Sequence, residues 1–170
     1  RDILGSNEFK NRKSNLTFSL GKDVSGKPWV ANIDPLPHLL IAGATGSGKS
    51  VLVNGLIISL LTSNSPDDLK LILVDPKRVE LTLYNGVPHL LTPVITDTTK
   101  TINALRWVVG EMDRRFGVLS NAGKRNISAY HESGGDMPYI VLVIDELADI
   151  MQTYPRELEA AIVRLAQMSR

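Results

Sequence analysis

No cysteine occurs among the 170 residues of this chain, which excludes disulfide bonds and thiolate chemistry. No apolar run reaches the length of about 18 residues that a membrane-spanning helix needs. A strong excess of one charge is also missing, because the formal net charge is +1. A nucleic-acid contact would therefore have to be a local patch. The chain does have 43% hydrophobic residues, enough for the core of one domain of ordinary size.

A glycine-rich segment between two apolar runs is the most informative part of the sequence. It fits G-x-x-x-x-G-K-[ST], the pattern of phosphate-binding loops in nucleoside triphosphatases. The segment consists of Gly43, Ala44, Thr45, Gly46, Ser47, Gly48, Lys49 and Ser50. The run 38–42 before it predicts a buried strand, and the run 51–61 after it predicts a helix. A strand followed by this loop and a helix is the context in which the pattern binds phosphate.

The residue types in this segment suit a nucleotide. Glycines let the backbone curl around a phosphate and point its N–H groups inward, toward an anion that also faces the positive end of the helix dipole. Lys49 can reach the β- and γ-phosphates, and the Ser50 hydroxyl can ligate Mg²⁺. We predict that residues Gly43 to Val51 bind ATP with Mg²⁺. The alternative is a glycine-rich turn that binds nothing.

A second apolar run ends in two acidic residues. The run 139–144 predicts a central parallel strand, and Asp145 and Glu146 follow it. Acids at the carboxyl end of such a strand lie where α/β folds bind ligands. We predict that Asp145 holds Mg²⁺ through water and that Glu146 orients or deprotonates the attacking water. The alternative is that both acids only decorate the start of a helix.

The order of apolar segments predicts an α/β fold. Strands are expected at 38–42, 69–74 and 139–144, with helices at 51–61, from about 98 and from about 155. Strands joined through helices form parallel sheets with right-handed crossovers. We therefore predict a RecA-like P-loop core, a parallel sheet flanked by helices, at residues 37–170. A small lead-in subdomain at residues 1–36 precedes it, with strands near 16–20 and 29–31.

The helix from about residue 98 is predicted to bury one apolar stripe, which ends before a capping Gly123. The stripe consists of Ile102, Leu105, Val108, Val109, Met112, Phe116 and Leu119. Arg114 and Arg115 on the same helix are expected to form surface ion pairs. The strand and helix that separate the glycine loop from Asp145 favour ATPases of the motor, helicase and transporter branch. GTPases are disfavoured, because no Asn-Lys-x-Asp occurs.

Six segments together strongly resemble the FtsK/SpoIIIE family of DNA translocases. They are residues 37–50, 75–81, 86–91, 104–107, 111–116 and 145–149, and residues 20–28 are similar to the lead-in of the family. The resemblance implies a Mg²⁺-dependent ATPase that pumps double-stranded DNA during cell division or sporulation. It also implies a homo-hexameric ring, and a cytoplasmic motor attached to the membrane through an N-terminal domain outside this chain.

The same resemblance assigns residues. Lys49, Ser50, Asp145 and Glu146 match the catalytic positions of the family. Arg170 matches in spacing an arginine that the family presents to the nucleotide of the neighbouring subunit, where it would stabilise transition-state charge. The alternative for Arg170 is an ordinary surface arginine.

The family core continues beyond the position of residue 170, so we expect the chain to be incomplete at its C-terminus and the DNA-contacting loops to lie elsewhere. Lys124 and Arg125 are local candidates for phosphate contact, with a plain solvated loop as the alternative. Two other functions stay open: a related ring ATPase that drives type VII-like protein secretion, and a fragment that binds nucleotide without hydrolysing it. The segments 75–78 and 114–115 look more like the DNA pumps, although the role of residues 75–78 is not assigned.

Overall fold

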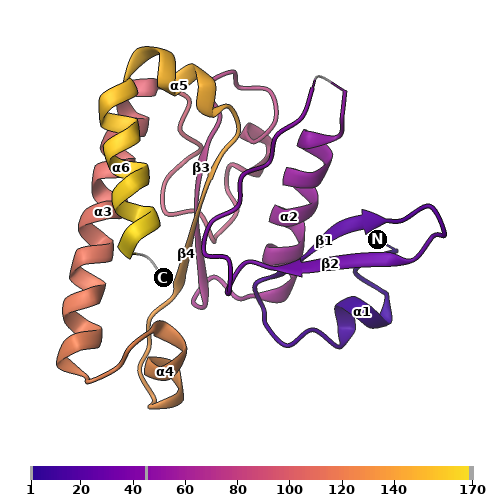
Figure 1. Cartoon of the computed structure of the whole chain (residues 1–170), viewed down its shortest axis with the longest axis horizontal. Helices are drawn as coiled ribbons and strands as arrows, with labels where there is room; N and C mark the ends of the chain where they lie inside the picture. Colours follow the sequence, from indigo (N-terminus) through magenta and orange to yellow (C-terminus); the bar gives the residue numbers. More distant parts are fainter. Residues whose placement is uncertain (1, 45, 169–170) are drawn as a thin grey trace. The chain divides into compact units, whose positions relative to one another are not determined.

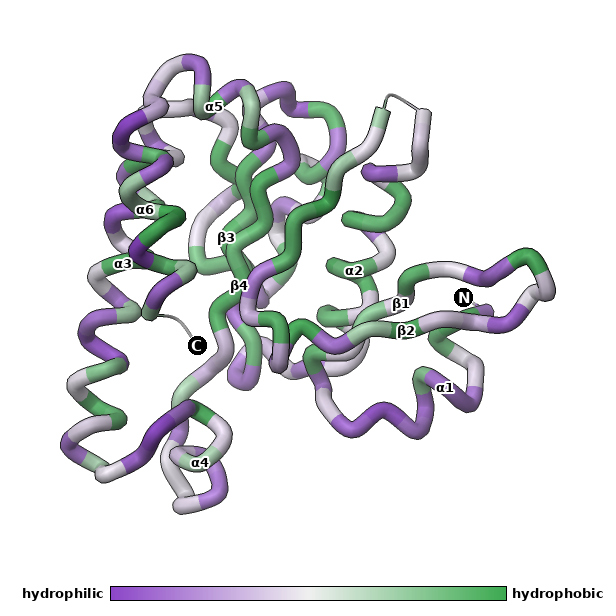
Figure 2. Tube along the Cα trace, viewed as in Figure 1, coloured by the Kyte–Doolittle hydropathy of each residue, from purple (hydrophilic) through white to green (hydrophobic). Residues whose placement is uncertain are grey.

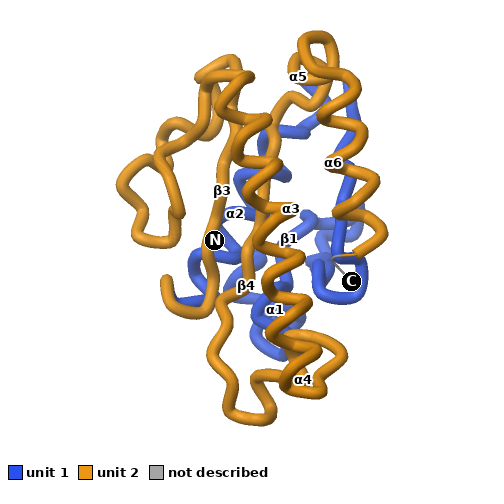
Figure 3. The backbone as a smooth tube through the Cα atoms, turned by 90° about the vertical axis from the view of Figure 1, so that its left-hand side faces the viewer, with its two compact units in different colours: residues 1–65 blue, residues 66–170 orange. Residues whose placement is uncertain are grey.

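A computed structural model describes residues 2–44 and 46–168. The chain divides into two compact units, residues 1–65 and residues 66–170, which Figure 3 shows in two colours. The boundary predicted from the sequence, between residues 36 and 37, stays a prediction.

The first unit is built on a β-hairpin. After the short helix α1 (Asn7–Lys10), strand β1 (Thr17–Lys22) pairs antiparallel with β2 (Pro28–Asn32), with a register shift between Ser19 and Gly21 (Figure 1). The Asp23 carboxylate closes the turn, since it accepts hydrogen bonds from the backbone N–H groups of Ser25 and Lys27. Both strands predicted in the lead-in are confirmed.

Helix α2 (Lys49–Ser63), the helix predicted after the glycine loop, packs on β1. Ser59 is fully buried at this contact: its hydroxyl donates to the Gly55 carbonyl at 2.6 Å and accepts from the Ser19 N–H at 3.2 Å. A Cβ atom on Gly55 would lie 3.3 Å from Ser19 Oγ. The absence of a side chain at Gly55 therefore lets the helix approach the strand closely.

The predicted buried strand at residues 38–42 is wrong. The segment forms no strand and joins no ladder among the described residues, and Leu39 and Leu40 are 43% and 80% exposed. An apolar run predicts that its side chains prefer to be buried. It does not supply the neighbouring backbone whose hydrogen bonds make a strand.

The second unit contains a parallel sheet. Strand β3 (Leu69–Val74) pairs with β4 (Tyr139–Ile144) in register from Leu69↔Tyr139 to Val74↔Ile144. Both strands have the bounds predicted from the sequence. On the other edge of β3, single parallel bridges join Leu71 to Leu90 and Val74 to Ile95.

The two strands differ in burial. Five of the six residues of β3 are buried, and Figure 2 shows β3 as hydrophobic along most of its length. Every residue of β4 is only half-buried, and its ladder partner among the described residues is β3 alone. The sequence predicted a central strand, but β4 lies at an edge in the described structure, which explains its exposure.

Three helices cover the sheet of the second unit: α3 (Thr98–Asn121), α5 (Leu147–Thr153) and α6 (Pro155–Met168). They contact one another, and α3 and α6 lie side by side in Figures 1 and 3. Their shared core is formed by Ile72, Val74, Ile95, Ile102, Leu105, Ile150 and Leu158. This parallel sheet with packed helices confirms the predicted α/β class. No helix in the described part of the chain is both long and apolar enough to cross a membrane.

The end of α3 is partly as predicted. Gly123 has φ 65°, its N–H donates to the Ser120 carbonyl, and the Lys124 N–H donates to the Leu119 carbonyl, so the predicted glycine cap is confirmed. Phe116, predicted to be buried, is 57% exposed. The core residues of α3 lie in its first half, and the second half extends past them. The short helices α4 (Ile127–Glu132) and η1 (Thr82–Tyr84) were not predicted.

Candidate nucleotide-binding site

The predicted phosphate-binding loop lies in the first unit, directly before α2. Gly46 and Gly48 have φ angles of 79° and 93°, a region that residues with a side chain rarely adopt. A Cβ atom on Gly43 would collide with the Ser47 side chain. The positive φ angles favour glycine at Gly46 and Gly48, and a side chain on Gly43 would force the Ser47 side chain to move. Glycines at these places suit a tight backbone cradle. Ala44 is exposed, and Thr45 lies outside the described residues.

The amino end of α2 is suited to an anion. Gly48 caps the helix without a side chain, and no acidic residue occupies the first turn. The positive end of the helix dipole is thus not offset by a capping carboxylate. Lys49 and Ser50, half-buried, are the first two helical residues, and the Val51 side chain is 76% exposed. The cradle and the helix start fit the phosphates of a nucleotide.

The predicted acidic pair lies in the second unit, at the carboxyl end of β4. The Asp145 N–H donates to the Val74 carbonyl at 3.0 Å, which extends the ladder by one residue. Glu146 is the N-cap of α5, with φ −126° and ψ 91°, and its side chain makes no capping hydrogen bond. The structure thus brings Asp145 and Glu146 together at the rim where α/β sheets bind ligands.

The neighbouring strand β3 ends in Asp75, whose role the sequence did not reveal. Asp75 is fully buried, and its Oδ2 accepts hydrogen bonds from the N–H groups of Glu80 at 3.0 Å and Leu81 at 2.8 Å. Burial by itself would raise the pKa of this carboxyl, but the backbone N–H groups of residues 78–81 hold the pKa below its usual value. Asp75 is therefore the anchor of the loop 75–81.

Lys77 on this loop contacts two carboxylates. Its Nζ lies 3.4 Å from Glu146 Oε2 and 3.5 Å from Asp149 Oδ2. The negative charge of Asp149 is the main cause that raises the pKa of Lys77, and Glu146 adds to it. Sequence reasoning missed Asp149 and this pairing. The available signal was the position of Asp149, three residues after Glu146 in the first turn of a helix.

Two further predicted residues lie in a loop of the second unit. Lys124 is half-buried and Arg125 is exposed, both in the loop between α3 and α4. Arg170 lies outside the described residues. The phosphate-binding loop belongs to the first unit and the acidic pair to the second.

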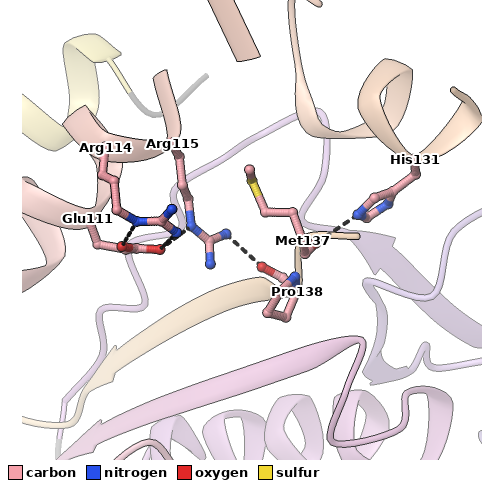
Figure 4. Close-up of polar contacts among 6 residues, drawn as sticks. All are labelled: Glu111, Arg114, Arg115, His131, Met137 and Pro138. Atoms are coloured by element: carbon pink, nitrogen blue, oxygen red, sulfur yellow. Dashed lines mark hydrogen bonds and ion pairs between the residues drawn. The ribbon is translucent and has the colours of Figure 1, made fainter. Parts of the chain in front are cut away.

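Arg114 and Arg115 form ion pairs, as predicted, but the pair of Arg115 is not at the surface, because its side chain is only 16% exposed (Figure 4). Both guanidinium groups contact the Glu111 carboxylate at 2.7 Å, and Arg115 also donates to the Pro138 carbonyl at 2.6 Å. Hydrogen bonds from Arg114, followed by those from Arg115, lower the pKa of Glu111 to about 2. This cluster connects α3 to the residue that precedes β4.

The sequence matches the family model of the FtsK/SpoIIIE family over residues 1–138. The DNA translocase FtsK of Campylobacter jejuni is 52% identical over the whole chain, which covers 18% of that protein. The DNA translocase FtsK of Haemophilus influenzae is 46% identical over the whole chain, which covers 37% of it. The chain thus spans well under half the length of these curated relatives.

Solved structures of ATPase domains share the fold. The pCW3 conjugation coupling protein TcpA, solved with ATPγS, has a TM-score of 0.72 and 26% identity, over 94% of this chain and 46% of TcpA. The cytoplasmic domain of the type VII secretion ATPase EccC of Thermomonospora curvata has a TM-score of 0.77 and 27% identity, over 92% of this chain and 20% of EccC. The fold is therefore that of P-loop ATPases, and the family match over most of the residues shows that this chain belongs to the FtsK/SpoIIIE family.

Proposed function

We propose that this chain supplies the ATP-binding and hydrolysing part of a motor that moves double-stranded DNA. The observation that carries the proposal is the loop Gly43–Ser50, which has two glycines at positive φ and ends at a helix start without a capping carboxylate. Family membership and relatives named DNA translocase support DNA as the substrate that is moved.

In the proposed reaction, the N–H groups of residues 43–51 and the Lys49 ammonium group hold the phosphates of ATP. Ser50, and Asp145 through water, would hold Mg²⁺, since hydroxyl and carboxylate groups supply the hard oxygen atoms that this ion prefers. The metal ion supplies charge stabilisation on the transferred phosphoryl group. Glu146 orients a water molecule and accepts its proton as the water oxygen attacks the γ-phosphorus and ADP leaves.

The wider assembly is part of the same proposal. Homo-hexameric rings enclose the duplex, and Arg170 faces the nucleotide of the neighbouring subunit, where its charge stabilises the transition state. The motor lies in the cytoplasm, attached to the membrane through a segment outside this chain, and moves chromosomal DNA during cell division or sporulation. Lys124 and Arg125 offer positive charge to DNA phosphates.

A protein-secretion ATPase is the second candidate, because the type VII secretion ATPase EccC shares the fold. EccC is 27% identical to the chain, whereas the translocase relatives are 46% to 53% identical. The sequence similarity favours DNA as the moved polymer.

The test is the ATPase rate of the intact protein with and without duplex DNA, beside Lys49→Ala and Glu146→Gln variants. We expect stimulation by DNA that falls with rising salt concentration, because phosphate contacts release counterions. Both variants are expected to lose hydrolysis, and Glu146→Gln is expected to keep nucleotide binding. Hydrolysis that is indifferent to DNA would refute the DNA motor and favour secretion.

A further inference from the structure

The segment 75–81, to which the proposed chemistry gives no role, forms a fixed loop at the carboxyl end of β3. The buried Asp75 carboxylate holds the loop from inside through the N–H groups of Glu80 and Leu81. Arg78 has φ 58°, a left-handed conformation that a residue with a side chain keeps only where the surrounding structure imposes it. The backbone that carries Lys77 is therefore held in one conformation.

Lys77 reaches from this loop to the end of the neighbouring strand. Its ammonium group lies between Glu146, which ends the β4 segment, and Asp149, in the first turn of α5. One cation thus connects the ends of β3 and β4 with the start of α5, three elements of the same unit (Figure 1).

This ion pair adds little to stability, and its main effect is on the position of the side chains. The Lys77 side chain is 54% exposed, and ion pairs of that kind stabilise a fold by about 1 kcal/mol at most. The Glu146 side chain makes no capping hydrogen bond to α5. The ion pair with Lys77 is a contact that restrains the direction of its carboxylate.

We propose that Lys77 is a positioning residue for Glu146: held in place by Asp149, it fixes the direction of the carboxylate that orients the attacking water. The inference rests on the proposed function, from which it takes the role of Glu146. A base that is itself oriented by a third group is the usual arrangement where a nucleophile must be aligned.

The test compares Lys77→Met and Lys77→Arg with Lys70→Met in the intact protein. Lys70 lies near the start of β3, the strand that leads into the loop with Lys77, and its replacement matches the loss of one charge. We expect Lys77→Met to lower the kcat of ATP hydrolysis by roughly tenfold or more, as misplaced groups do. The Kd for ATPγS and the melting temperature should stay at their wild-type values. Lys77→Arg should recover part of kcat, and Lys70→Met should hydrolyse ATP at the wild-type rate.

Substitution of Asp149 provides a second test, because a purely structural role of Lys77 would not couple the effects of the two substitutions on kcat. Asp149→Asn should lower kcat by a few-fold, because Lys77 then loses one of its two partners. Added to Lys77→Met, the same substitution should have no further effect, since Asp149 acts through Lys77.

The inference is overturned if Lys77→Met hydrolyses ATP within twofold of the wild-type rate or if Lys77→Arg recovers none of the lost kcat. It is also overturned if the fold-losses in kcat caused by the Lys77 and Asp149 substitutions multiply in the double variant. Glu146→Gln separates it from the proposed function. A wild-type rate of hydrolysis in Glu146→Gln would refute the proposed role of Glu146, and the positioning role of Lys77 would fall with it. An inactive Glu146→Gln beside a fully active Lys77→Met would refute only the positioning role.

Discussion

Replacing Glu111 by glutamine should destabilise the fold, by an amount that depends on pH. The Glu111 side chain is only 14% exposed and bonds two guanidinium groups, which lower the pKa of its carboxyl from 4.5 to about 2. At 1.36 kcal/mol per pKa unit, this shift sets an upper limit of roughly 3 kcal/mol. Since Arg114 is 61% exposed, solvent screens part of the interaction, and we expect about 1–2 kcal/mol.

The pH dependence follows from the direction of the shift. The pKa of Glu111 is lower in the folded chain than in the unfolded chain, so its stabilising effect is complete above pH 4.5 and is lost as the pH falls toward about 2. Glu111→Gln cannot titrate. The difference in unfolding free energy between wild type and variant should therefore shrink by half or more between pH 7 and pH 3.

Urea unfolding at a series of pH values measures this difference. Asp113→Asn is the control, because it removes an acid two residues further along the same helix. Asp113 and its ion-pair partner Arg164 are 44% and 53% exposed, so this substitution should change stability little. A Glu111→Gln variant as stable as wild type at pH 7 would refute the reasoning. A loss that is the same at pH 7 and pH 3 would show that the carboxylate charge is not its cause.

Two further predictions concern close packing. Gly135→Ala should lower the unfolding free energy by about 1–3 kcal/mol, because the added Cβ would collide with the Tyr130 ring. Gly110→Ala in α3 meets open space and should raise the unfolding free energy by up to about 1 kcal/mol. Thermal unfolding of both variants tests these effects, and equal melting temperatures would contradict them. Ser59→Ala should cost about 1–3 kcal/mol, since it removes the acceptor for the Ser19 N–H at a fully buried contact between α2 and β1; urea unfolding measures this loss, and a stability equal to wild type would mean that the N–H finds another partner.

The elements with strong local patterns were predictable from the sequence. The bounds of β3 and β4 follow from continuous apolar runs, and the end of α3 follows from Gly123. The glycine loop was predictable because the positive φ angles of Gly46 and Gly48 are a property of the residues themselves.

The errors concern properties that depend on distant parts of the chain. Residues 38–42 have the composition of a strand, but pairing requires a partner backbone that composition does not encode. Phe116 has the spacing of a core residue, yet the core ends before that turn of α3. The periodic pattern shows which side of a helix is apolar. The number of helical turns that are buried depends on the extent of the sheet against which the helix packs.

The candidate site shows the same division. The acidic pair was found from its place after an apolar strand, whereas the pairing of Lys77 with Glu146 joins residues 69 positions apart. It depends on two strands lying side by side in parallel, so that both carboxyl ends meet at one rim. No local pattern carries that information.

The half-covered strand β4 has a consequence for handling the protein. Its six residues, Tyr139 to Ile144, are all β-branched, aromatic or leucine, without charge, proline or glycine. Among the described residues β4 has a ladder partner on one edge only. An unpaired edge is a template on which other chains can add strands, and short segments of this composition build amyloid-like fibrils. The strand that carries the acids to the rim is thus also the place from which this chain would be expected to aggregate.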